Sequence, residues 1–292
     1  MTFGRSWRLA AAAALAVAVA GCGLGPGERT EGEATLTVTR DYGAERMVEA
    51  TVSDPSESET VIRFLDREAD ITTRYGGNFV QSIEGLAGEY RDGRSLDWFF
   101  YVDGLWSPVG AGEREVSAGQ RIWWDYHDWT DAERVPVVVG SWPEPLAPQA
   151  SLECAAQAST CDLVAARLAK AGIDNGDGDD LPRVLVGPWP ELRKDRAAAL
   201  LGHGPQASGV FARFSNDELV ALDVRADPAA TYGDGAGLVA AVRDGEDPPT
   251  LLVTGTDAAG VKAAAGLLDT EHLEDRYAVL TSGADVMPLP VQ

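Results

Sequence analysis

Basic residues are scarce in this sequence, and their scarcity excludes several classes of protein. The 292 residues include 24 Lys and Arg against 46 Asp and Glu, which gives a formal net charge of −22. A chain without a basic stripe is not a general binder of nucleic-acid backbones, and anionic lipid would repel it. We therefore expect no nucleic-acid partner.

Cysteine and histidine are also rare, with three of each. This supply is too small for several zinc ions or an iron–sulfur cluster, so we expect no metal site and no cofactor. The sequence also lacks the G-x-S-x-G elbow of many hydrolases and the glycine fingerprints of nucleotide-binding loops. These absences favour a protein that is not an enzyme.

Long apolar runs are missing, apart from a short one near the start of the chain. Residues 9–20 form an apolar stretch that is too short for a membrane-spanning helix, which needs about 20 residues. Arg5 and Arg8 precede this stretch, and Val-Ala-Gly-Cys follows it at 19–22. This order is typical of a bacterial lipoprotein signal peptide over residues 1–21.

The expected lipid acceptor is the thiol of Cys22. A diacylglycerol there would anchor the protein to the extracytoplasmic face of the cell membrane. The alternative is an ordinary secretory signal in which the cysteine is incidental. The remaining pair, Cys154 and Cys161, lacks C-x-x-C spacing and is predicted to form a structural disulfide in an exported chain.

Composition changes along the chain indicate a flexible tether and two domains. Residues 22–33 are polar and rich in glycine, as expected for the tether. Residues 34–139 contain short alternating segments that predict a small β-rich, β-grasp-like domain. Within this domain, residues 57–69 fit a short helix nearly as well as a strand.

A second domain is predicted after a proline-containing linker. Residues 140–150 hold three prolines and form the expected linker. Over 151–292, strands and helices alternate, which favours an α/β sandwich domain with a mixed sheet. In this domain, residues 237–243 are predicted as a short helix. The predicted fold class of the whole chain is α+β.

Three sequence blocks in the first domain carry a family resemblance. They are FVQSIEG at 79–85, DWFFYVDG at 97–104 and VSAGQRIWWDY at 116–126. Their order and spacing resemble the transcobalamin-like C-terminal domain family, a DUF4430-type β-domain. Gln120 stands where an acid is common in that family, and Ser82 falls in the first block as a candidate ligand contact.

The resemblance implies a binding function. In cobalamin carriers the corresponding domain covers one face of the corrinoid, while a helical barrel, which this chain lacks, holds the other face. A corrinoid or another flat molecule is thus the implied ligand, which would pass to a transporter or an envelope partner. We expect a non-enzymatic ligand-binding lipoprotein active in uptake or surface assembly. The alternative is a structural cell-envelope interaction module without a small-molecule ligand.

Aromatic residues concentrate in the same domain. Adjacent residues on a strand point to opposite faces, so half of the rings must lie outside one core. The predicted recognition face consists of Trp98, Phe100, Trp106, Trp124 and Tyr126. The opposite set is Phe99, Tyr101 and Trp123, and the sequence does not decide which set faces outward. The second domain is an alternative cover for such rings.

Two acidic motifs are interpreted as surface features. Asp125, His127 and Asp128 lie at a strand end, where a solvated loop is favoured over a metal or acid–base site. Residues 174–180 are similar to a calcium loop but lack the glutamate of its twelfth position. An acidic surface loop is therefore expected there, with weak calcium binding as the alternative.

Overall fold

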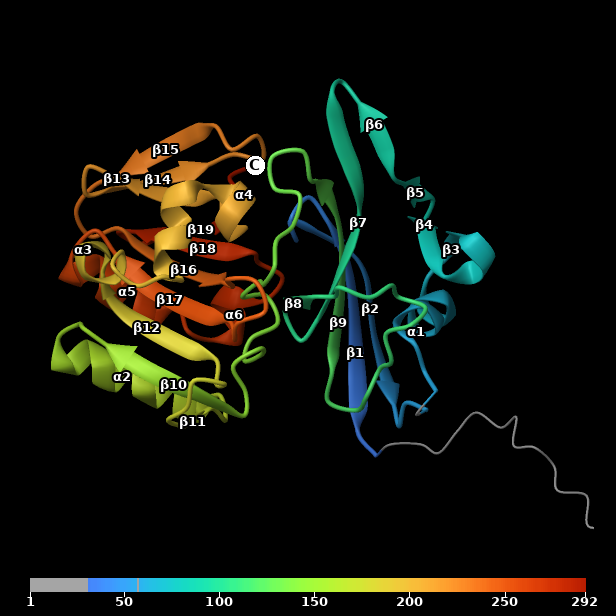
Figure 1. Ribbon diagram of the computed structural model, residues 1–292, viewed down its shortest axis with the longest axis horizontal. Coiled ribbons are helices and arrows are strands. Elements are labelled where there is room, and N and C mark those ends of the chain that lie inside the picture. Colours follow the sequence, from blue (N-terminus) through green and yellow to red (C-terminus); the bar gives the residue numbers. More distant parts are fainter. Residues whose placement is uncertain (1–30, 57) are drawn as a thin grey trace, which may run out of the picture.

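The computed structural model describes residues 31–56 and 58–292 and shows two bodies side by side (Figure 1). The predicted signal peptide and Cys22 lie outside the described residues. We call residues 33–128 the N-terminal unit and residues 149–289 the C-terminal unit. Over the part of the chain that is described, none of the helices combines the length and the apolar composition needed to cross a membrane.

The N-terminal unit is built around one mixed sheet. Its elements are β1 (Glu33–Arg40), β2 (Glu45–Ser53), α1 (Val61–Glu68), β3 (Ile71–Arg74), η1 (Tyr75–Gly77), β4 (Phe79–Ile83), β5 (Leu86–Ala87), β6 (Glu89–Arg91), β7 (Arg94–Val102), β8 (Leu105–Trp106) and β9 (Arg121–Asp128). The sheet has the order β2-β1-β9-β7-β6, and β8 pairs with β7. Strand β1 runs parallel to β9, whereas β2 and β7 are antiparallel to their neighbours. Strands β3, β4 and β5 form a small separate sheet.

Helix α1 covers one face of the main sheet. Val61, Phe64 and Leu65 are fully buried, and their spacing places them on one side of the helix. They share a core with alternate residues of β1, β7 and β9. Residues 57–69, which the sequence left open between helix and strand, therefore contain a helix.

The C-terminal unit has a larger mixed sheet with layers on both faces. Its elements are β10 (Gln149–Cys154), α2 (Ala158–Lys170), β11 (Asp174–Asn175), β12 (Arg183–Pro188), α3 (Trp189–Leu192), η2 (Ala198–His203), α4 (Pro205–Ser208), β13 (Ala212–Ser215), β14 (Glu218–Leu222), β15 (Pro228–Tyr232), β16 (Gly237–Val242), β17 (Thr250–Gly255), α5 (Ala258–Gly266), α6 (Thr270–Leu273), β18 (Ala278–Ser282) and β19 (Asp285–Leu289). The sheet order is β11-β10-β12-β17-β16-β18-β19. Helices α2, α5 and α6 pack on one face, while the β13–β15 sheet and the short helices α3, η2 and α4 cover the other.

The short helix predicted over 237–243 is wrong, because this segment is strand β16. All six residues of β16 are buried between its neighbours β17 and β18. A strand buried on both faces has no polar side, so its apolar run carries neither the helical nor the alternating period.

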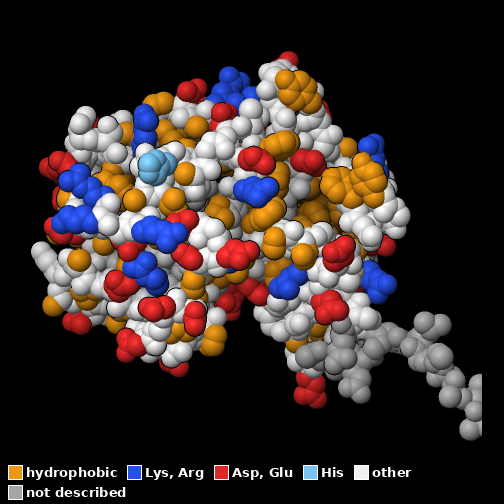
Figure 2. All heavy atoms as spheres, in the orientation of Figure 1, with side chains coloured by type: hydrophobic (Ala, Val, Ile, Leu, Met, Phe, Trp, Pro, Cys, Tyr) orange, Lys and Arg blue, Asp and Glu red, His pale blue; other side chains and the backbone are white. Residues whose placement is uncertain are grey.

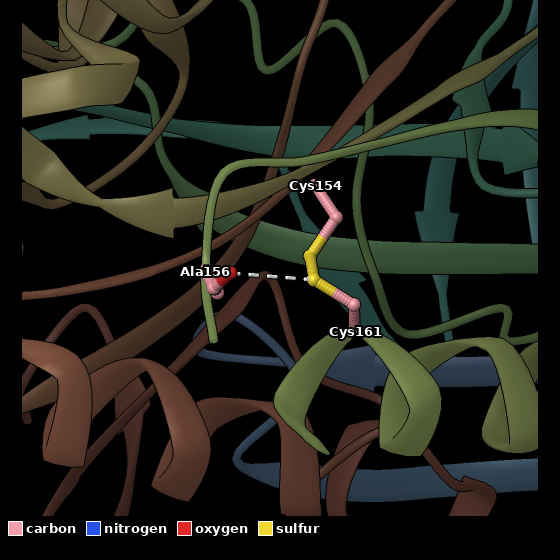
Figure 3. The surroundings of a disulfide bond; sticks show 3 residues. All are labelled: Cys154, Ala156 and Cys161. Carbon is pink, nitrogen blue, oxygen red and sulfur yellow. Dashed lines mark hydrogen bonds between the residues drawn. A yellow bond between two sulfur atoms is a disulfide. The ribbon is translucent and has the colours of Figure 1, made fainter. Parts of the chain in front are cut away.

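The predicted disulfide between Cys154 and Cys161 is present (Figure 3). It joins the last residue of β10 to the first turn of α2, with the two Cα atoms 5.9 Å apart. Cys161 Sγ also lies 3.6 Å from the carbonyl oxygen of Ala156. The bridge therefore fixes the tight connection between a strand and the helix that follows it.

The segment between the two units is packed into the protein. Trp142 and Leu146, both in the proline-containing stretch, are buried in the core beneath α2 and α5. Val137, just before this stretch, forms an isolated antiparallel bridge to Leu105. The connection is therefore a structural part of the C-terminal unit and not an exposed spacer.

The second face of the N-terminal sheet is covered by the C-terminal unit. Tyr101 and Trp123 point to this face and contact Tyr277, with ring centroids 5.8 and 5.2 Å from it. Gly43 permits the close approach, since a Cβ there would lie 1.9 Å from the carbonyl oxygen of Asp275. An ion pair between Arg46 and Asp275 lies at the same junction.

Candidate functional site

The aromatic strip expected from the sequence exists in the predicted register. Trp98 lies opposite Tyr126, and Phe100 lies opposite Trp124, across the antiparallel pair β7 and β9. The rings of Phe100 and Trp124 stack with centroids 4.8 Å apart. These four side chains therefore share one face of the sheet, as strand alternation requires.

This face is nevertheless not an open recognition surface. The four side chains Trp98, Phe100, Trp124 and Tyr126 are each at most 9% exposed. They belong to the core that α1 and the β3–β5 sheet complete. The sequence prediction of an exposed face is therefore wrong, because these covering elements come from a separate part of the chain.

Tyr126 and Ser82, which the sequence also proposed as ligand contacts, make hydrogen bonds within the protein. Tyr126 donates its hydroxyl to the carbonyl oxygen of Ala87 at 3.1 Å. Ser82 is buried and lies 2.6 Å, oxygen to oxygen, from Thr72. Neither residue lines the hollow described next. The alternative set Phe99, Tyr101 and Trp123 faces the junction with the C-terminal unit.

Part of the aromatic strip opens into a hollow of about 280 Å³. We call it the aromatic hollow, and its main walls are Phe79, Trp98, Phe100, Trp106, Val109 and Trp124. No charged side chain lines it. In Figure 2, hydrophobic side chains gather in a depression between β7 and β4. Four of the residues proposed from the sequence thus line one cavity, although Trp106, which pairs with Tyr101, also packs against the junction cluster.

The hollow exists because the edge of β7 is incompletely paired. Strand β6 pairs with β7 only as far as Leu96, and β8 begins its pairing at Tyr101. The hollow is lined by the intervening residues 98–100. A gap between two short edge strands therefore gives access to the rings beneath them.

The indole N–H groups of the sheet differ in their hydrogen bonding. Trp98 Nε1 donates to the carbonyl oxygen of Leu86 at 2.8 Å, and Trp123 Nε1 donates to Thr39 at 2.8 Å. Among the described residues, Trp124 Nε1 is buried without a hydrogen-bond partner. An unpaired buried N–H of this kind costs free energy in the folded protein.

A second polar centre lies at the junction, where Asp125 and His127 are almost fully buried. Asp125 accepts hydrogen bonds from the backbone N–H of Tyr42 at 3.1 Å and of Gly43 at 2.9 Å. The Tyr277 hydroxyl lies 3.1 Å from one carboxylate oxygen, and His127 Nδ1 lies 2.8 Å from it. The prediction of a solvated loop is wrong here, because the C-terminal unit covers these groups.

This centre is a satisfied hydrogen-bond network and not an open site. Phe99 stacks on the His127 ring with centroids 4.6 Å apart, which closes one side. In the described part of the chain, no group of three His, Cys, Asp or Glu side chains is arranged to hold a metal ion, and this includes the acidic residues 174–180. Asp174 and Asn175 instead form β11, which pairs with β10.

The comparisons with known proteins concern the unit that holds the aromatic hollow. A family model described as a domain of unknown function, DUF4430, matches residues 58–128. Residues 58–128 are a DUF4430 domain. All six main walls of the hollow fall within this DUF4430 domain. A comparison with curated proteins finds no match.

One similar solved structure is that of a proposed metal-binding protein from Ruminococcus gnavus ATCC 29149, determined at 1.30 Å. It is 16% identical, and the alignment covers 34% of this chain and 98% of that chain with a TM-score of 0.26.

Proposed function

We propose that this protein is a non-enzymatic, lipid-anchored binding protein on the extracytoplasmic face of the cell membrane. It holds a ring-bearing ligand in the aromatic hollow of its DUF4430 domain and passes it to a transporter or an envelope partner. The observation that carries the proposal is one uncharged cavity lined by four aromatic residues of the predicted set, namely Trp98, Phe100, Trp106 and Trp124. Aromatic walls favour flat apolar groups through stacking and area burial.

The volume of the hollow limits the size of the ligand that it can hold. Pockets for drug-sized molecules have volumes of roughly 300–1,000 Å³. A volume of about 280 Å³ is therefore suited to one ring system or to the edge of a larger macrocycle. A corrinoid, which the family resemblance implies, would insert an edge while most of the macrocycle stayed outside.

The arrangement of the chain supports two finer proposals about the fold. The parallel pair β1 and β9, with α1 across one face, supports a β-grasp-like domain over residues 34–139. The layers around the larger sheet support an α/β sandwich over residues 151–292, after a linker at 140–150.

The binding proposal is tested by dialysis and calorimetry on the purified full chain. Cobinamide and cobalamin are measured by equilibrium dialysis, and 1-naphthalenemethanol, a small neutral ring probe, by calorimetry. Phe79→Ala, at a wall that is 46% exposed, should weaken binding roughly fivefold to tenfold without unfolding the protein. Thr73→Ala is the control, because Thr73 is exposed on the neighbouring strand β3 but does not line the hollow. Absence of binding by all three compounds would contradict the proposal.

Membrane attachment is tested separately through Cys22. The Cys22→Ser variant should move from the membrane fraction to the soluble fraction, or should accumulate unprocessed. A processed variant that still sediments with membranes would refute the lipid anchor.

The alternative function, a structural envelope module without a small ligand, is favoured by a different observation. Tyr101 and Trp123 are buried where the two units meet, so these aromatics serve packing rather than recognition. Under this alternative, the Phe79→Ala variant would leave all ligand measurements unchanged.

A further inference from the structure

A second hollow adjoins the aromatic one along the edge of β7. We call it the acidic hollow, and it has a volume of about 300 Å³. It is lined by residues 95–97, whereas the aromatic hollow is lined by residues 98–100, and Phe79 lines both. At about 3.3 Å per residue, the two form a groove along roughly 20 Å of β7. We call this groove the β7 groove.

The two ends of the β7 groove differ in charge. No charged side chain lines the aromatic hollow, whereas the acidic hollow is lined by Glu89 and Asp97 against Arg74. Arg74 donates its Nε–H to Gln81 at 2.7 Å, and Glu89 lies 3.3 Å from Arg91. Asp97 takes part in no ion pair within the described residues. Two of the three charged side chains that line the acidic hollow are therefore acidic, and of these two carboxylates that of Asp97 is the one without an ion-pair partner.

The carboxylate of Asp97 is held in place by its own backbone and by a glycine. Its Oδ1 accepts the N–H of Trp98 at 2.8 Å. A Cβ at Gly88 would lie 2.6 Å from the same oxygen, so only glycine leaves room for the carboxylate there. Burial raises the pKa of Asp97, and the hydrogen bond from the Trp98 N–H and the nearby His127 offset only part of this effect.

Aromatic side chains surround this carboxylate. Phe79, Tyr90 and Trp129 line the acidic hollow, and Tyr90 is 77% exposed. Ring faces attract ammonium groups, with a strength that grows as water is excluded. Exposed rings beside a desolvated carboxylate are thus suited to an organic cation rather than to an anion or a neutral group.

We infer that the β7 groove selects ring-bearing organic cations, with the ring in the aromatic hollow and the ammonium group beside Asp97. This inference rests on the proposed function, since it assigns a ligand class to the same site.

Three probes that carry the same naphthalene ring separate the contribution of ligand charge to the affinity from that of ring shape. Calorimetry on the full chain compares 1-naphthylmethylammonium, 1-naphthalenemethanol and 1-naphthoate. We expect the ammonium compound to bind about tenfold more tightly than the alcohol, and the carboxylate compound to bind more weakly than both. In Asp97→Asn the preference for the ammonium compound should fall to twofold or less, while the affinity for the alcohol stays unchanged.

The matched control is Asp92→Asn, which changes an exposed acid in the turn between β6 and β7 and should keep the tenfold preference. Tyr90→Leu provides a second variant at an exposed position, in case Asp97→Asn does not fold. It should also reduce the preference for the ammonium compound.

The outcomes distinguish this inference from the proposed function. Equal affinity for the ammonium compound and the alcohol would overturn the inference but leave ring binding intact. Retention of the tenfold preference in both Asp97→Asn and Tyr90→Leu would overturn it as well. If none of the three probes binds, the aromatic hollow is not a ring site, and the proposed function and the inference both fail.

Discussion

At the scale of single residues, Asp125 shows how a charged group can be buried completely. The carboxylate has 0% exposure, and it is surrounded by backbone N–H groups, the Thr39 and Tyr277 hydroxyls and His127. These donors replace the water that the carboxylate loses on folding. Because Tyr277 belongs to the other unit, the same residue also links the two halves of the molecule.

We predict that Asp125→Asn destabilises the folded protein by about 3 kcal/mol, because an amide cannot accept from all of these donors. Urea unfolding followed by circular dichroism would measure the change. The control is Asp66→Asn, at an exposed position on α1, which should shift the free energy of unfolding by less than about 0.5 kcal/mol. A loss below about 1 kcal/mol in Asp125→Asn would contradict the prediction.

Glu144 is a residue whose surroundings favour its neutral form. Burial, reinforced by the nearby carboxylate of Asp103, raises the pKa of Glu144 to about 7, while Arg121 acts in the opposite direction. In the unfolded chain a glutamate ionises near pH 4.3. Between these two pH values, Glu144 of the folded protein therefore keeps a proton that it has lost in the unfolded chain. Stability should rise as the pH falls from 8 toward 5.

We predict that Glu144→Gln removes this dependence and stabilises the protein at pH 8 by roughly 1 kcal/mol, allowing for solvent screening of a half-buried group. At pH 5 the variant and the wild type should be nearly equal in stability. Thermal unfolding at both pH values is the measurement, with Glu133→Gln as the exposed control. A variant that is equally stable to the wild type at pH 8 would refute the assignment.

At the scale of elements, strands β7 and β9 mark how far the sequence could predict the site. Strand alternation predicted which rings share a face, and the pairs Trp98 with Tyr126 and Phe100 with Trp124 confirm it. The covering of each face could not be predicted in this way. It depends on α1 and the β3–β5 sheet on one side and on Tyr277 and its neighbours on the other. Such contacts are long-range, and no local pattern encodes them.

The same reasoning explains the failure at β16 and at His127. A strand buried on both faces has no polar side to reveal its period. His127 looks polar and exposed in a local window, since its cover lies about 150 residues further along the chain. The β7 groove was also missed, because it arises from the shortness of two edge strands rather than from a motif. The sequence did contain one signal for the groove, because Tyr90 is an aromatic residue within the otherwise polar segment 88–94.

The connection between β10 and α2 gives a prediction about the disulfide. Replacing Cys154 and Cys161 with Ser should lower the free energy of unfolding by roughly 2–3 kcal/mol, as the loop-length relation gives for a short loop. Intact mass before and after reduction should differ by two hydrogen atoms in the wild type and by none in the variant. Two free thiols in freshly exported protein would contradict the pairing.

At the scale of the whole molecule, the two units share one core. The cluster that contains Tyr42, Tyr101 and Trp123 continues into Phe211 and Tyr277 of the C-terminal unit. Arg94 of β7 also donates to the carbonyl oxygen of Val224 at 3.0 Å. An apolar junction of this kind disfavours independent motion of the two units.

We therefore predict one cooperative unfolding transition in differential scanning calorimetry, with the calorimetric and van't Hoff enthalpies nearly equal. Gly43→Ala should lower the melting temperature or split the transition, because the added carbon clashes with Asp275 and the backbone φ is +83°. Gly266→Ala is the control, since nothing lies within 4 Å of a Cβ there. Two separate transitions in the wild type would refute the prediction.

The sheet of the N-terminal unit therefore has two faces under different constraints. The junction face is bound to the C-terminal unit through Tyr101, Trp123 and the Asp125 network, so a change there has to be matched by a change elsewhere. Some walls of the β7 groove are instead exposed side chains of short strands and loops, such as Phe79, Tyr90 and Val109. Substitutions at these exposed positions can alter selectivity while the core and the junction stay intact, which leaves part of the groove open to evolutionary change and to redesign.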